Sequence, residues 1–369
     1  AGRISMNTKR PEWIDANNAL VGNGVSMVTL YYMRRFLAFF QEILEKTPQD
    51  TIKISGEMVE FYHTLRECLE QRTHWLQHPI NDAQRKEMVD CLGKAASEYR
   101  TQIYESGFWG KKRTHSMAGL KRFVALALEY LEHSIQANQR PDQLYHAYNL
   151  MEYTPQGITL DYLPEMLEGQ VAALSSGYLS SEQAIDTLHA LRNSALYRPD
   201  QDSYVLYPNK ALPKFLEKNN IPAAEVLASP LLQKMVARND ARLINKDLHG
   251  NYHFNGNFHN ANDVSAMLKQ LESQPEYADV LAQEASKVLQ LFEKVFVHKA
   301  FTGRSGTFYG YDGFGSIYCH MVSKLVLAVA EIYEKVQAQK ESQTVIDRLA
   351  HHFHAINAGI GVHKSPSVY

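Results

Sequence analysis

Carboxylates, amides and a tryptophan are concentrated near the start of the chain. Glu12 and Asp15 flank Trp13, and Asn17 and Asn18 follow before a long apolar run. In a sugar site, a tryptophan ring stacks on a pyranose, amides bond its hydroxyls, and a carboxyl group protonates the leaving oxygen. The same residues also suit an ordinary helix start, where Asp15 or Asn17 would accept from free backbone N–H groups. The segment therefore predicts either a capped helix or a sugar site with Asp15 as the acid.

A second group of chemical interest comes late in the chain. Glycines alternate there with aromatic residues, including Tyr309 and Tyr311, and Arg304, Asp312 and His320 supply the polar chemistry. The segment precedes a predicted helix, whose N-terminal N–H groups would hold phosphate together with Arg304 and His320. Asp312 could instead activate a water molecule as a base. A glycine-rich turn before a capped helix is the simpler alternative.

A pair of glutamates, Glu165 and Glu168, lies three residues apart in a predicted helix over residues 160–175. Such a pair on one helical face is usually solvated. The apolar neighbours Met166 and Leu167 indicate that part of this helix is buried, which favours a functional role for Glu168.

Three histidines, His249, His253 and His259, are spaced by four and six residues in a segment rich in Asn and Gly. Histidines can bind a metal, but this segment is not helical and has no clear carboxylate partner. We predict a hairpin or loop around an Asn-Gly turn, and no metal site.

The first segment resembles a known enzyme family. Trp13-Ile14-Asp15-Ala16-Asn17-Asn18, followed by Gly22, Gly24 and Ser26, is similar to the W-N-D-G-x-N…G…G-x-S segment of cellobiose/chitobiose phosphorylases. Those enzymes are inverting glycoside phosphorylases built on an (α/α)6 toroid, an architecture related to that of glucoamylase-like hydrolases. The resemblance implies that Asp15 is the general acid. Ile14 and Ala16 stand where the family pattern has Asn and Gly.

The resemblance implies an enzyme that cleaves a glycosidic bond with inversion, by water or by phosphate. An inverting hydrolase needs a second carboxyl group about 6.5–9.5 Å from the acid, and the candidates are Glu12, Glu165, Glu168 and Asp312. An inverting phosphorylase needs only the acid, because phosphate is the nucleophile. We expect the substrate to be bound by Arg10, Glu12, Trp13, Asn18, Arg304, Tyr309, Tyr311 and His320. The alternative is a non-catalytic helical scaffold or glycan-binding protein.

Helical periodicity dominates the chain and sets its predicted fold. Apolar residues recur near the 3.6-residue period, and few segments alternate as strands do. No repeat of about 30–47 residues indicates a solenoid, and no composition shift marks a domain boundary. We predict an all-α toroid of helical hairpins, of the six-hairpin glycosidase type, as one domain over residues 1–369. The main predicted helices cover residues 25–46, 56–71, 81–104, 116–138, 160–175, 182–194, 261–273, 275–297, 316–336 and 342–358, with short ones near 212–219, 222–228 and 230–239.

Composition excludes several classes of function. The net charge of -2 over 369 residues gives no general attraction to nucleic acid, and no apolar run reaches the roughly 20 residues of a membrane-spanning helix. The cysteines, Cys68, Cys91 and Cys319, are odd in number and far apart. We therefore expect no disulfide framework and no zinc, and a cytoplasmic location. We also expect an oligosaccharide substrate, no cofactor beyond inorganic phosphate as a co-substrate, and either a piece of a longer chain or a homo-oligomer.

Overall fold

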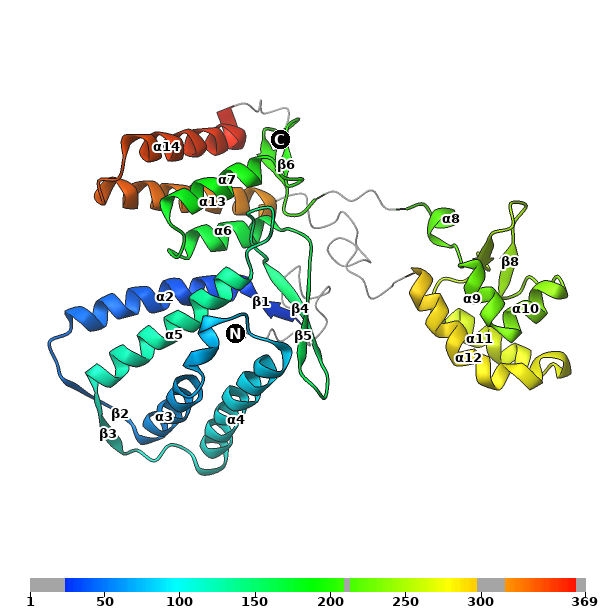
Figure 1. Cartoon of the computed structure of the whole chain (residues 1–369), viewed down its shortest axis with the longest axis horizontal. Coiled ribbons are helices and arrows are strands. Elements are labelled where there is room, and N and C mark those ends of the chain that lie inside the picture. Colours follow the sequence, from blue (N-terminus) through cyan, green and yellow to red (C-terminus); the bar gives the residue numbers. More distant parts are fainter. Residues whose placement is uncertain (1–23, 209–212, 297–315, 363–369) are drawn as a thin grey trace. The chain divides into compact units, whose positions relative to one another are not determined.

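The computed structural model describes residues 24–208, 213–296 and 316–362 (Figure 1). These residues are mostly helical, with a few small antiparallel sheets. The prediction of a helical protein is confirmed at this level, and closure into a toroid stays a prediction. The chain divides into two compact units, where the sequence predicted one domain. Unit 1 comprises residues 1–209 and 301–369, and unit 2 is Lys210–Ala300.

Unit 1 contains eight of the described α-helices, and two of them begin at polar caps that their sequence indicates. Asn81 begins α4 with a capping box in which its side chain accepts from Gln84 N at 2.9 Å, and Ser180 begins α7 in the same way with Gln183. A polar side chain at this position satisfies one of the free N–H groups of the first turn. The helices are α2 (Met27–Lys46), α3 (Gly56–Glu70), α4 (Asp82–Ser106), α5 (Met117–Ala137), α6 (Leu167–Ser175), α7 (Ser181–Arg192), α13 (Ser316–Ala338) and α14 (Gln343–Asn357), with a short 3-10 helix η1 (Thr73–Gln77) and a short π-helix η2 (Ala358–Val362).

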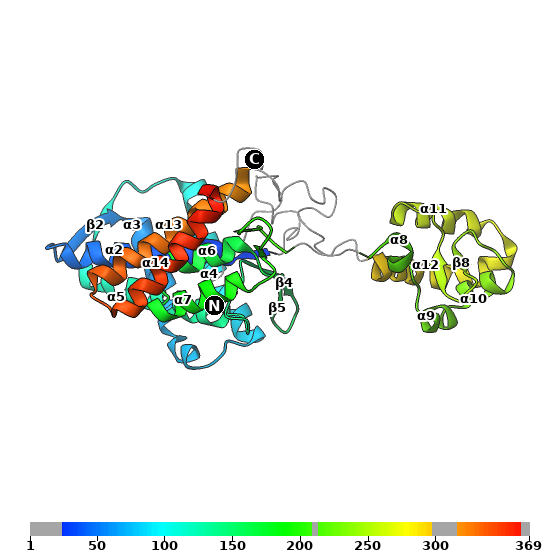
Figure 2. The same cartoon turned by 90° about the horizontal axis from the view of Figure 1, so that it is seen from above.

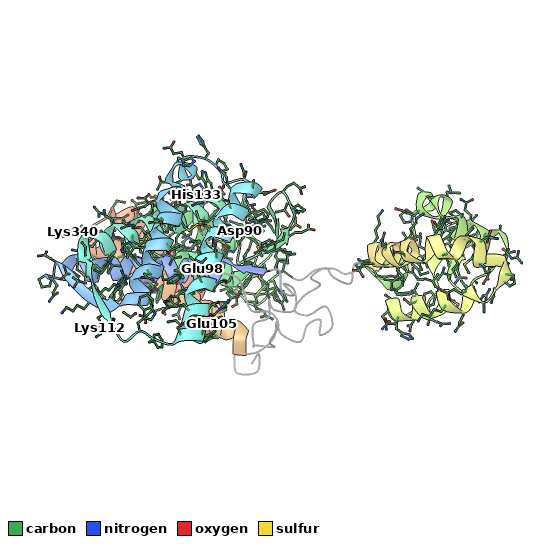
Figure 3. The ribbon with its side chains drawn as sticks, turned by 90° about the horizontal axis from the view of Figure 1, so that it is seen from below. Asp90, Glu98, Glu105, Lys112, His133 and Lys340 are labelled. Atoms are coloured by element: carbon green, nitrogen blue, oxygen red, sulfur yellow. A yellow bond between two sulfur atoms is a disulfide. The ribbon has the colours of Figure 1, made fainter. Side chains whose placement is uncertain are left out.

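The core of unit 1 is formed where these helices pack against one another. α2 lies beside α5 and α6, and α13 lies beside α6 and α14 (Figures 1 and 2). Leu30 and Tyr31 of α2 are fully buried together with Ile135 of α5 and Leu325 of α13. Exposed acids of α4, namely Asp90, Glu98 and Glu105, follow that helix along its solvent face (Figure 3).

A three-stranded antiparallel sheet interrupts the helices of unit 1. It is formed by β1 (Gly24–Ser26), β4 (Tyr148–Tyr153) and β5 (Ile158–Tyr162), in the order β1-β4-β5. The sequence predicted a helix from residue 160, which is wrong for its first part, since α6 begins only at Leu167. The β4–β5 turn packs on α4 so closely that a Cβ at Gly157 would lie 2.6 Å from the backbone of Asp82. Smaller two-stranded sheets pair β2 (Thr51–Ser55) with β3 (Lys112–Ser116) and β6 (Tyr197–Arg198) with β7 (Ser203–Tyr204).

Two cysteines form a disulfide, which corrects the prediction from their spacing. Cys68 of α3 is bonded to Cys91 of α4, 23 residues further along the chain. The two helices pack side by side after a short connection, so residues that are far apart in sequence meet. Spacing alone could not show this, because the contact depends on how the two helices pair.

Unit 2 folds around a hydrophobic core of its own. Fully or almost fully buried residues of this core include Leu231, Phe254, Tyr277 and Phe292. Glu284 is also buried, and it accepts a hydrogen bond from Ser229 Oγ at 2.5 Å and pairs with Lys287 Nζ at 2.7 Å. The elements are α8 (Phe215–Lys218), α9 (Ala223–Ala228), α10 (Pro230–Ala237), α11 (Ala261–Glu272) and α12 (Pro275–Phe296), with a hairpin of β8 (Ile244–Lys246) and β9 (Tyr252–Phe254).

Among the described helices, none is both long enough and apolar enough to pass through a lipid bilayer.

Candidate functional site

Most of the predicted site residues lie outside the residues that the structure describes. Their assignments therefore stay predictions, including Asp15 as the general acid. These residues are Arg10, Glu12, Trp13, Asp15, Asn18, Arg304, Tyr309, Tyr311 and Asp312. Glu165, Glu168 and His320 can be placed.

The two glutamates do not share a helical face, which corrects the interpretation of their spacing. Glu165 precedes α6, whose N-cap residue is Met166. Its carboxylate lies 3.3 Å from Arg140 Nη2. Glu168, in the first turn of α6, accepts a hydrogen bond from Tyr148 Oη at 2.8 Å. The two carboxylates thus bind different side chains, Arg140 and Tyr148.

His320 lies in the first turns of α13 and is exposed to solvent. Its predicted role toward sugar or phosphate stays a prediction, because its companions Arg304, Tyr309 and Tyr311 fall outside the described residues.

The histidine-rich segment forms a hairpin, β8–β9 of unit 2. Its turn is residues 247–251, so the predicted Asn-Gly turn is wrong: Asn255-Gly256 follows β9. His253 Nδ1 bonds the carbonyl oxygen of Asn219, and its Nε2 lies 3.3 Å from Asp247 Oδ2. Both ring nitrogens therefore fix the hairpin. Within the described ranges, no three His, Cys, Asp or Glu side chains are arranged to hold a metal ion.

A cavity of about 600 Å³ opens beside the β1-β4-β5 sheet of unit 1. Cross-strand neighbours of an antiparallel sheet share a face, and Val25, Asn149 and Tyr162 are such neighbours. All three line the cavity. Side chains alternate between the two faces of a strand, so Tyr148, which bonds Glu168, projects from the opposite face. Glu168 and this cavity therefore belong to opposite sides of β4.

The floor of the cavity is formed by buried amides. Asn149 is 1% exposed and Asn138 is 8% exposed. Asn149 Nδ2 donates to Asn138 Oδ1 at 2.6 Å, and Asn138 Nδ2 donates to Ser134 O at 2.8 Å. Asn149 Oδ1 has no hydrogen-bond partner among the described residues. A buried acceptor without a partner is costly, so this oxygen is ready to accept from a ligand hydroxyl or a water molecule.

The cavity walls include the polar side chains of Arg85 and His133. Arg85 is paired with an acid, and His133 is neutral at pH 7. The Arg85 guanidinium bonds Asp82 Oδ1 at 2.6 Å and Ile80 O at 3.1 Å, which fixes it in place. His133 Nε2 lies 3.0 Å from His78 O, and burial lowers the pKa of His133, which favours its neutral form at pH 7. Figure 3 labels His133 on α5.

No aspartate or glutamate is among the described residues that line this cavity. It can therefore bind a ligand through hydrogen bonds and apolar contacts, but it would need a carboxyl group from elsewhere to donate a proton. Its volume is in the usual range for small-ligand sites. Buried amides beside apolar side chains suit an uncharged, hydroxyl-rich molecule.

Sequence reasoning gave no role in a site to Asn138 or Asn149. The signal was weak but present, because Tyr145-His146-Ala147-Tyr148-Asn149 gathers polar and aromatic residues in a short stretch. Asn149 becomes part of a site only when β4 pairs with β1 and turns that side chain toward α5.

The comparison with known families gives a match to part of the chain. Residues 212–299 match the family model described as GH149 phosphorylase insertion domain 2. This match suggests a protein related to glycoside phosphorylases. The matched segment covers unit 2 (Lys210–Ala300) almost from end to end, and unit 1 is continued in sequence on both sides of it, as expected of an insertion. A search of curated proteins gives no match to the chain.

Proposed function

We propose that this chain is part of a glycoside phosphorylase that cleaves a glycosidic bond with inversion, with Asp15 as the general acid. The observation that carries the proposal is the match of residues 212–299 to a phosphorylase insertion domain. The resemblance of Trp13 to Ser26 to inverting phosphorylases supports the same class from a separate part of the sequence.

The proposed reaction is a displacement at the anomeric carbon. A phosphate oxygen attacks that carbon from the side opposite the leaving group, and the bond from the carbon to the glycosidic oxygen breaks. Asp15 gives its proton to the departing oxygen, which becomes a hydroxyl of the shortened saccharide. The products are a sugar 1-phosphate of inverted configuration and a free saccharide. No second catalytic carboxylate is needed.

The cavity beside β4 would bind part of the saccharide. Asn138 and Asn149 would hydrogen-bond sugar hydroxyls, and Val25, Met151 and Leu160 would contact the apolar face of the ring. Val25 of β1 lines this cavity and lies ten positions after Asp15 in the sequence. The proposed acid is therefore close in sequence to a strand that borders the cavity. The absence of an acid among the described lining residues fits a role in binding the sugar, with the proton supplied from Asp15.

Hydrolysis is the alternative reaction of the same architecture, and Glu168 or Asp312 would then be the base. Two features favour phosphorolysis. The matched domain model carries the name of a phosphorylase, and Glu168 is bonded to Tyr148 on the side of β4 that faces away from the cavity.

The test is a phosphate-dependent degradation assay. Gluco-, manno- and galacto-configured oligosaccharides are incubated with the protein in phosphate buffer and in phosphate-free buffer. Phosphorus and proton NMR then identify any sugar 1-phosphate and its anomeric configuration. A sugar 1-phosphate with inverted configuration, formed only with phosphate, supports the proposal. Free reducing sugar formed equally in both buffers supports hydrolysis, and retained configuration rejects inversion.

A further inference from the structure

A second cleft of unit 1 lies between α7 and α14, two helices that pack together (Figure 1). It has a volume of about 660 Å³. Basic and imidazole side chains line it from both helices: His189 and Arg192 from α7, and Arg348, His351 and His352 from α14. Asp347 is the one acid among the described residues that line it.

Each arginine of the cleft has one acidic partner, and one guanidinium nitrogen of Arg192 has no hydrogen-bond partner among the described residues. Arg192 Nη2 donates to Asp202 Oδ1 at 2.8 Å, and the guanidinium also bonds Tyr204 and stacks on the Tyr197 ring, 3.8 Å from its centre. Its Nη1 atom is buried without a hydrogen-bond partner among the described residues. A buried guanidinium N–H normally has an acceptor, so this group indicates a place for one. Arg348 Nη1 bonds Glu182 Oε2 at 2.9 Å, and both side chains are largely exposed, so an incoming anion can compete for Arg348.

The side chains around His352 indicate a positive electrostatic potential in the cleft. Burial, together with the nearby His351, His189, Arg348 and Arg192, lowers the pKa of His352 to about 4. These four neighbours of the imidazole are all basic groups. Half-buried basic side chains that face one another attract an anion, because it relieves their mutual repulsion.

We propose that the cleft between α7 and α14 binds a phosphate group, either as inorganic phosphate or as the phosphate of a sugar phosphate. Arg192 Nη1 would donate to one phosphate oxygen and Arg348 to another, while the imidazoles of His351 and His352 would flank the anion. A planar guanidinium suits this contact because its N–H groups match the spacing of phosphate oxygens. The site is separate from the cavity beside β4, and it does not depend on the proposed catalytic activity.

The experiment follows the histidine ring signals of the full chain by NMR during titration with inorganic phosphate, glucose 1-phosphate or glucose. We expect saturable shifts of the His351 and His352 signals with both phosphate compounds and none with glucose. Equal affinity for the two compounds would show that the cleft recognises the phosphate group alone. Tighter binding of glucose 1-phosphate would identify a sugar phosphate as the ligand.

Matched variants locate the site. Arg348→Gln should weaken phosphate binding about tenfold or more, because it removes a charge-assisted hydrogen bond. Lys335→Gln, which removes the same charge from an exposed position of α13 outside the cleft, should leave it unchanged. Glu182→Gln should tighten binding, since it frees Arg348.

An absence of saturable shifts at His351 and His352 would overturn the proposal, and so would unchanged binding in Arg348→Gln. Binding that persists in Arg348→Gln but is lost in Asp15→Asn would instead belong to the proposed catalytic site. Failure of the proposed phosphorylase activity would leave the result at this cleft unaffected.

Discussion

Removing the Cys68–Cys91 disulfide should destabilise unit 1 by a predictable amount. The bond closes a loop of 24 residues, since the cysteines are 23 positions apart. In the chain-entropy account, closing a loop of that length stabilises the fold by about 3.5 kcal/mol at 25 °C. The same loop carries Leu76, Ile80 and Arg85, which line the cavity beside β4. The double variant Cys68→Ala, Cys91→Ala should therefore lose both stability and order in that cavity wall.

Tryptophan fluorescence during urea unfolding measures this change selectively. The three tryptophans of the chain, Trp13, Trp75 and Trp109, all belong to unit 1, so their emission reports on that unit and not on unit 2. Trp75 is buried and lies within the closed loop itself. The matched control is Cys319→Ala, which leaves the disulfide intact and should behave as the unaltered protein does when reductant is absent.

Two results would refute this reasoning. One is the titration of three free thiols in the unreduced, urea-unfolded protein, which would show that the bond does not form. The other is a double variant whose free energy of unfolding falls by less than about 1 kcal/mol, well below the expected range for such a loop.

Three further predictions concern other parts of the structure. Asn149→Ala removes the buried amide of the cavity floor, and it should abolish the rise in melting temperature that a bound saccharide gives, measured by thermal shift. Ser229→Ala leaves the buried Glu284 without its hydroxyl partner, and it should destabilise unit 2 by about 1–3 kcal/mol, measured as faster hydrogen exchange in residues 210–300. Burial holds the pKa values of His146 and His352 near 4, below the usual 6.5, so both imidazoles are kept neutral. Stability of unit 1 should therefore fall as pH drops from about 6.5 to about 4, and replacing both with Gln should flatten that slope.

Each of these predictions has a result that contradicts it. Saccharide stabilisation that survives in Asn149→Ala would place sugar binding elsewhere. Unchanged exchange in Ser229→Ala would mean that Glu284 has adequate partners without the hydroxyl. An unaltered pH profile after replacement of both histidines would assign acid sensitivity to other groups, such as Asp142, whose pKa is lowered by bonds from Arg140 against the effect of burial.

Local signals in the sequence predicted the helices well. The Asn81 and Ser180 caps act within one turn of the chain, so residues a few positions apart suffice to recognise them. The β4–β5 hairpin was missed because its stability depends on β1, more than a hundred residues earlier in the chain. Leu160 therefore fits a helical pattern in sequence but lies in a strand.

Features that depend on distant segments were missed for the same reason. Cys68 and Cys91 meet only because α3 and α4 pair. The boundaries of unit 2 carry no change of composition, and that unit is recognisable only by its separate core and its family match. In contrast, the resemblance around Asp15 needed no tertiary structure, because adjacent residues carry it.

The most direct test of the central claim compares the unaltered protein with Asp15→Asn in sugar 1-phosphate synthesis and breakdown. The account predicts phosphate-dependent formation of sugar 1-phosphate from an identified oligosaccharide, lost in Asp15→Asn and retained in Glu168→Gln. An amide cannot donate the required proton, whereas Glu168 has no step in phosphorolysis. Full phosphorolytic activity in Asp15→Asn would contradict the assignment of the acid, and cleavage that is independent of phosphate would contradict the claim of a phosphorylase.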